Sequence, residues 1–177
     1  FEDVSKAANK IKNEILATKY TKNLIKNSSF EDNITQDYGW ANVLSGDART
    51  GNKYLNITRN ENSYGIGYVK MSVPKGKNYT FSFYSKSTTG YDAYLSYNIG
   101  AETYNSDLIN ILPSTDYQRY SISLYYPEEA TSELKANFEM IFYGNAQIDD
   151  LQLEEGKIAN YYNMLNNGDF SDDLTNW

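Results

Sequence analysis

The sequence predicts an all-β fold, an antiparallel jelly-roll β-sandwich preceded by one N-terminal α-helix. Three observations support this class: short runs of alternating apolar and polar residues, turn-forming residues between those runs, and a high tyrosine content. The 177 residues include 18 Tyr, 7 Phe and 2 Trp, and tyrosine favours pleated, half-buried strand surfaces. The length suits one main domain with a single core.

The first element is the helix, expected over residues 3–20. Val4, Ala8, Ile11 and Ile15 recur at helical spacing, with Lys and Asn on the other face. An apolar stripe this narrow cannot form a core by itself. The segment therefore either packs against a neighbouring domain or is a frayed linker helix.

Nine alternating runs follow and are expected to be strands. They span residues 23–26, 38–44, 53–58, 64–73, 78–86, 91–98, 118–126, 136–144 and 146–154. In the fifth run Tyr79, Phe81 and Phe83 share one face, which is typical of a sheet with one buried side. Pro and Gly residues mark turns between the runs, and residues 100–117 are expected to form the long crossover loop of the jelly roll.

An internal repeat sets the expected domain boundaries. The segment from Asn23 to Thr35 aligns without gaps on the segment from Asn163 to Thr175, and each copy runs on to a tryptophan. A period of about 140 residues is too long for a solenoid and suits tandem whole domains. The expected units are a helical connector over 1–22, one complete β-sandwich over 23–162 and the truncated start of a following repeat over 163–177.

The composition excludes several classes of function. A net charge of −7 opposes binding to a phosphate backbone, so nucleic acid is not an expected partner. No apolar stretch is long enough to span a bilayer, so membrane insertion is not expected. With no His and no Cys, the chain cannot build a Ser-His-Asp triad, a thiol nucleophile or a histidine or thiolate zinc site. No pair of acids lies in a recognisable glycosidase motif, so the chain is not expected to be an enzyme.

The order of several short motifs resembles a known family. The motifs are NLIKNSSFE, a tryptophan after a glycine, GDARTGNKYLNIT, VPKGKNYTFSFYSK and AQIDDLQLEEGKIANYYN. This order is similar to that of carbohydrate-binding-module-like, galactose-binding-domain-like jelly rolls, which occur in tandem in clostridial and bacillar Rhs/YD-repeat wall-associated proteins and toxins. The resemblance implies a non-catalytic module, beside neighbouring modules of the same polypeptide, in a larger Gram-positive bacterial protein that is secreted or displayed at the cell surface.

The resemblance also implies a structural Ca²⁺, which takes six to eight oxygen ligands. The expected ligands are Glu31, Asp47, Thr50, Lys53 and Asp149, with Thr50 and Lys53 contributing backbone carbonyls. Asp149 is in phase with Leu151 and should point inward, where a carboxylate without a cation is costly, whereas Asp150 should face solvent. The alternative is that these acids are ordinary surface residues.

Sugars bind to flat aromatic rings combined with amides and carboxylates. Such residues lie on the expected exposed sides of the strands, on a tyrosine-bearing sheet or in edge loops: Tyr84, Tyr94, Asn98, Arg119, Tyr125, Glu139 and Tyr143. The alternative is that they only stabilise a solvated sheet. Trp40 has a counterpart in Trp177 of the second copy and is expected in the core.

Two functions remain open from the sequence. The first is the binding of a glycan, a cell-wall or host polysaccharide. The alternative is a structural spacer or interaction module within a wall protein, toxin or phage tail that binds no sugar.

Overall fold

The structure, a computed structural model, describes Val4, Lys6 and residues 22–32 and 36–160. Val4 and Lys6 are helical, and the rest of the expected helix lies outside the described residues, as does the second copy of the repeat. The domain boundaries therefore stay predictions. Within the described part, no helix is long and apolar enough to cross a membrane.

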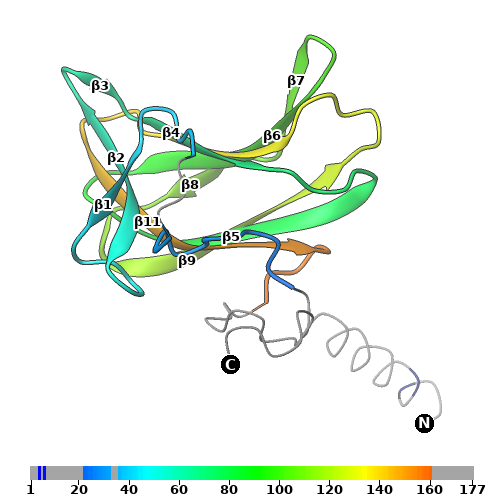
Figure 1. The fold of residues 1–177 in the computed structure, drawn as a ribbon, viewed down its shortest axis with the longest axis horizontal. Helices are drawn as coiled ribbons and strands as arrows, with labels where there is room; N and C mark the ends of the chain where they lie inside the picture. Colours follow the sequence, from blue (N-terminus) through cyan, green and yellow to red (C-terminus); the bar gives the residue numbers. More distant parts are fainter. Residues whose placement is uncertain (1–3, 5, 7–21, 33–35, 161–177) are drawn as a thin grey trace.

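Eleven strands in the described residues form two antiparallel sheets, stacked as a sandwich (Figure 1). The six-stranded sheet, here the β5 sheet, has the order β1 (Asn42–Ser45), β2 (Lys53–Asn60), β11 (Gly144–Glu155), β5 (Lys77–Ser87) and β9 (Ser114–Tyr126), with β3 (Ser63–Tyr64) paired to β2. The five-stranded sheet, here the β6 sheet, has the order β4 (Ile66–Met71), β10 (Leu134–Glu139), β6 (Tyr91–Ile99) and β7 (Glu102–Asn105), with β8 (Ile109–Ile111) paired to β6. The expected all-β sandwich is confirmed.

The core lies between the two sheets and is built on the predicted alternation. Tyr79, Phe81 and Phe83 of β5 are all 0% exposed, and they meet the β6 sheet at Phe138, which is also 0% exposed. The ring of Phe138 lies 5.2 Å from that of Phe83, edge to face, and 6.2 Å from that of Phe81. Each such side chain contributes about 1.5–3 kcal/mol by leaving water, so this aromatic layer joins the sheets.

Two expected elements differ from the structure. Residues 23–26 form no strand, although the Leu24 amide donates to the Leu153 carbonyl at 2.8 Å. The expected crossover loop over 100–117 instead contains β7, β8 and the start of β9. All four residues of β7 are exposed, so they carry no alternation that would have revealed a strand.

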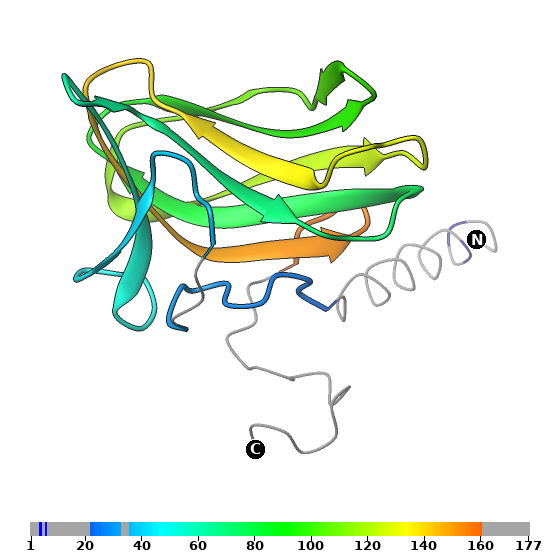
Figure 2. The same ribbon diagram turned by 45° about the horizontal axis from the view of Figure 1, so that its top comes forward.

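The outer face of the β5 sheet is covered at its centre, contrary to the expectation of one buried side. Thr80, Ser82 and Glu154 point away from the core, yet they are 1%, 1% and 0% exposed. Residues 156–160 cover that side, where the Gly156 carbonyl accepts from the Thr80 hydroxyl and the Asn160 amide donates to Glu154 Oε2, both at 2.9 Å. Residues 22–32 run beside β11 instead (Figure 2). The outer face of the β6 sheet is therefore the more open sheet surface.

Candidate functional site

The outer face of the β6 sheet presents three rows of side chains across β4, β10 and β6. The strand register places Asn137 opposite Tyr68 on one side and Tyr94 on the other. The flanking rows, by the same register, are Lys70, Lys135 and Ser96, and then Ile66, Glu139 and Asp92. Neighbouring strands lie about 4.8 Å apart, so the two tyrosines are two strand spacings, roughly 10 Å, from each other.

Hydrogen bonds and ring contacts fix the middle row. The Tyr94 hydroxyl donates to Glu139 Oε1 at 2.5 Å, and the Asn137 amide donates to Ser96 Oγ at 2.8 Å. Burial, and then the hydrogen bond to Glu139, raise the pKa of Tyr94 above its usual range, so its hydroxyl stays a donor. The middle row is thus arranged before any ligand arrives.

Tyr68 is held at its hydroxyl by a carboxylate and at its ring by two cations. Its hydroxyl bonds to the Asp37 carboxylate, and this contact is the main cause that holds the pKa of Asp37 below its usual range. The ammonium groups of Lys135 and Lys70 lie 5.0 and 5.2 Å from the centre of the Tyr68 ring. The face therefore combines two rings, one planar amide, hydrogen-bond acceptors on one flank and cations on the other.

Only three of the predicted ligand-binding residues lie on this face. Tyr94, Asn98 and Glu139 alternate outward on β6 and β10. Tyr68 and Asn137 were missed by the sequence reasoning. Their positions in alternating runs, beside the core residues Val69 and Phe138, were the signal that could have found them.

Tyr84, Arg119 and Tyr125 lie on the outer side of the β5 sheet, so the predicted binding residues do not share one face. The Arg49 guanidinium lies 3.5 Å from the centre of the Tyr84 ring and covers it. Arg119 donates to Gln152 Oε1 at 3.3 Å and to the Asn160 carbonyl, so it fixes the segment that follows β11 against the β5 sheet. Alternation shows that a side chain avoids the core, but not which of two opposite outer faces it joins.

Two other aromatic residues lie at the edge of the sandwich. Tyr143, the seventh predicted residue, follows β10 in a loop and is 64% exposed. Trp40, expected in the core, is 53% exposed. The core position in this region is taken by its neighbour Ala41, 6% exposed, because only one of two successive residues in an extended chain can point inward.

Four of the five predicted calcium ligands gather around residues 49–53. Glu31 Oε1 accepts from the Asn52 and Lys53 amides at 2.9 and 2.7 Å. Asp149 Oδ2 accepts from the Arg49 and Thr50 amides at 2.8 and 3.1 Å. The fifth residue, Asp47, points elsewhere: its carboxylate, 87% exposed, pairs with the Lys86 ammonium at 2.5 Å.

The two adjacent aspartates of β11 are both buried, so the expectation that Asp150 faces solvent is wrong. The expectation that Asp149 points into the core is also wrong, because the register pairs it with Tyr84 on the outer side of the β5 sheet. Asp149 is 0% and Asp150 1% exposed. The pairing of β11 with β5 shifts register between Asp149 and Gln152, and Asp150 has a φ of 49°, so a bulge breaks the alternation here. The Asp150 carboxylate bonds instead to the Arg49 guanidinium and the Thr50 hydroxyl.

Carboxylate oxygens around this loop are the donor type that a hard cation takes. Burial is the main cause that raises the pKa of Asp149 to about 7, and a nearby cation would favour its ionised form. The described residues contain no cluster of three acidic side chains that could hold a metal. Glu31 and Asp149 are suitable ligands for Ca²⁺ only if backbone carbonyls complete the set.

Comparison with known proteins identifies the relatives of this sandwich. A family model described as "Carbohydrate binding domain" matches residues 22–146. No curated protein sequence matches significantly. Among solved structures, the CBM22-1 xylan-binding domain of Xyn10C from Paenibacillus barcinonensis is similar at a TM-score of 0.62 and 17% identity, with 80% of this chain and 99% of that domain covered.

Two further solved structures share the fold. A family 16 carbohydrate-binding module gives a TM-score of 0.58 at 16% identity, covering 74% of this chain and 99% of the module. The module TmCBM61, solved with β-1,4-galactotriose, gives a TM-score of 0.55 at 16% identity, covering 77% of this chain and 100% of that one.

Proposed function

The chain belongs to the carbohydrate-binding domain family, and on that premise we propose that it binds a glycan chain, without cleaving it, on the outer face of the β6 sheet. The observation that carries this proposal is the row of Tyr68, Asn137 and Tyr94 across three paired strands. Aromatic rings pack against the C–H faces of sugars, and the amide and carboxylates bind their hydroxyls.

The arrangement favours the interior of an extended chain over a chain end. The two rings are two strand spacings apart, so a glycan that contacts both must run across the strands. Glu139 and Asp92 then lie along one edge of the chain and accept from its hydroxyls, while Lys135 and Lys70 lie along the other and donate.

Affinity electrophoresis in gels that contain soluble polysaccharides tests this site. Tyr94→Ala and Tyr68→Ala should each weaken retention by about tenfold, or about 1.4 kcal/mol, as expected for a ring at the centre of an interface. Tyr94→Phe keeps the ring and should retain most of the binding. No reducing ends should appear when the protein is incubated with the polysaccharide that retains it.

The matched control is Tyr125→Ala, which removes a 51% exposed tyrosine from the opposite sheet. It should leave retention unchanged. Equal loss in the Tyr125 and Tyr94 variants, or retention that survives the loss of both β6-sheet tyrosines, would refute the site.

We also propose that a structural Ca²⁺ binds between Glu31 and Asp149, with carbonyls of residues 49–53 as further ligands. A buried carboxylate whose pKa is raised to about 7 supports a cation there. Added CaCl₂ should raise the melting temperature of chelator-treated protein, and Asp149→Asn should abolish the rise. Asp47→Asn, which alters only a carboxylate paired with Lys86, should preserve it. A melting temperature that ignores both chelator and calcium would contradict the proposal.

We propose further that the module belongs to a larger secreted or surface protein of a Gram-positive bacterium, of the Rhs/YD-repeat kind. The recurrence of the segment from Asn23 to Thr35 at Asn163 supports a tandem array, in which several weak sites gain avidity. Antibodies against the module should label intact cells or the culture medium. Labelling that requires cell lysis would argue for an internal protein.

A further inference from the structure

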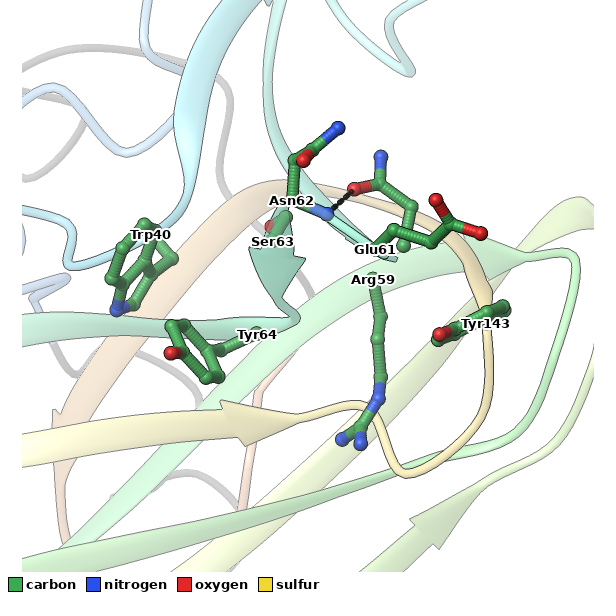
Figure 3. Close-up of a pocket in the computed structure, with 8 residues that line it drawn as sticks. Trp40, Arg59, Glu61, Asn62, Ser63, Tyr64 and Tyr143 are labelled. Atoms are coloured by element: carbon green, nitrogen blue, oxygen red, sulfur yellow. Dashed lines mark hydrogen bonds between the residues drawn. The ribbon is translucent and has the colours of Figure 1, made fainter.

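A pocket of about 430 Å³ lies at the edge of the sandwich, outside the β6-sheet face. It is formed by the β2–β3 hairpin, by Trp40, which lies two residues before β1, and by the loop after β10 (Figure 3). Its lining combines three aromatic rings, those of Trp40, Tyr64 and Tyr143, with the Arg59 guanidinium and the amides of Asn60 and Asn62. None of these residues belongs to the three rows on the β6 sheet.

The three rings are exposed in a way that the fold itself does not require. Trp40, Tyr64 and Tyr143 are 53%, 65% and 64% exposed. Trp40 and Tyr64 contact each other with centroids 5.0 Å apart and planes at 64°, and Tyr143 lies on the other side of Arg59 (Figure 3). Gathered exposed rings mark interaction sites more often than scattered ones.

The polar ends of these rings are also available. Within the described part of the chain, the Trp40 indole N–H and the hydroxyls of Tyr64 and Tyr143 form no hydrogen bond with protein. A ring that offers both an apolar face and an unused hydrogen-bonding group suits a sugar, which has C–H faces and hydroxyl edges.

Arg59 gives the pocket its charge. The guanidinium donates through Nη1 to the Met140 carbonyl at 2.7 Å, which fixes its position. Arg59 is half-buried and forms no ion pair with any acid among the described residues. The Glu61 carboxylate lines the same pocket but points away from the guanidinium (Figure 3). In a chain of net charge −7, this leaves a fixed cation without an acidic partner between aromatic rings.

We propose that this pocket is a second carbohydrate site, which binds a sugar residue bearing a carboxylate, a uronic acid. The sugar ring packs against the aromatic rings, and its carboxylate accepts from the remaining N–H groups of Arg59, the geometry in which arginine recognises carboxylates. This proposal rests on the proposed function for the class of ligand, a carbohydrate. The residues of the pocket and the test of its binding are independent of the β6-sheet site.

Fluorescence of Trp40 provides a local test. The chain has 2 Trp, so a Trp177→Phe background leaves Trp40 as the only indole. We would titrate this protein with D-galacturonate against D-galactose, and with D-glucuronate against D-glucose, at matched ionic strength. The acidic sugar of at least one pair should produce a saturable change and bind about tenfold more tightly than its neutral counterpart, a difference of about 1.4 kcal/mol.

Two variants assign the contacts. Arg59→Gln should remove the preference for the acidic sugar, while Tyr143→Ala should weaken both members of the pair. Lys77→Gln, which removes an exposed cation paired with Glu155, should change neither. Tyr68→Ala with Tyr94→Ala should also leave the Trp40 response intact, so failure of the β6-sheet site and failure of this one are distinguishable.

Three results would overturn the proposal. The first is no saturable change in Trp40 emission with either uronate. The second is an acid preference that survives Arg59→Gln. The third is an equal response to sodium acetate or to N-acetylglutamate, which would show a general carboxylate site, or one for a peptide, in place of a sugar site.

Discussion

Replacing Arg49 with Met tests the most consequential electrostatic contact of the structure. Arg49 pairs with Asp150, whose side chain is 0% exposed, while the arginine side chain is 28% exposed. Removing one partner of a buried ion pair leaves an uncompensated charge and costs about 3–5 kcal/mol. The Thr50 hydroxyl still donates to Asp150 in the variant, so we expect a loss near the lower limit, about 3 kcal/mol. Domains are stable by about 5–15 kcal/mol, so this is a large fraction.

Urea unfolding, followed by far-ultraviolet circular dichroism, measures the loss. Lys77→Met is the control, because Lys77 and Glu155 form an exposed pair, 41% and 55% exposed, that should contribute less than about 1 kcal/mol. The double variant Arg49→Met with Asp150→Asn should recover most of the stability, since no buried charge remains. If Arg49→Met cost no more than Lys77→Met, Asp150 would be solvated and the buried pair would be refuted.

Three further predictions concern the core and the dependence on pH. Phe138→Ala should lower the unfolding free energy by about 3–5 kcal/mol, because the ring is 0% exposed between the sheets; a loss below about 1 kcal/mol in urea unfolding would contradict that packing. Burial raises the pKa of Tyr91 above its ordinary value of 10.0, so its contribution to stability is complete below pH 10 and is lost as the pH rises further. Above pH 10 the unfolding free energy of Tyr91→Phe should fall less steeply with pH than that of the wild type, by up to about 1.4 kcal/mol per pH unit. Parallel curves of stability against pH for the two proteins would show that the hydroxyl is not buried. Burial likewise raises the pKa of Asp149 from 3.8 to about 7. With chelator present, the unfolding free energy of the wild type should therefore fall as the pH rises from 3.8 to 7. Asp149→Asn should show a flatter pH profile in the same denaturation series.

Much of the fold was predictable because strand alternation is a local property. The period-two pattern placed Tyr79, Phe81 and Phe83 on the core face of β5, and all three are buried. The same pattern placed Tyr94 and Glu139 outward, where the structure has them side by side. The pattern failed where the chain departs from regular extended geometry, as at the β11 bulge, where Asp150 is buried against Arg49 and Thr50.

The candidate binding face was predictable only in part, for a different reason. Tyr68, Asn137 and Tyr94 form a row because β10 pairs with both β4 and β6, and these strands are far apart in the sequence. No single run of residues contains that adjacency. The same limit explains why Tyr84 and Arg119 were grouped with Tyr94 although they lie on the opposite sheet.

The sequence by itself determined that this chain is a β-sandwich, that Tyr79, Phe81 and Phe83 face its core, and that the chemistry of His and Cys side chains is absent. Only the tertiary structure decided which outward residues share a surface, which acids are buried, and that Trp40 and Tyr143 line one pocket. The physical reason is that alternation follows from the pleat of each strand, whereas strand order and bulges are selected by the packing of the whole chain.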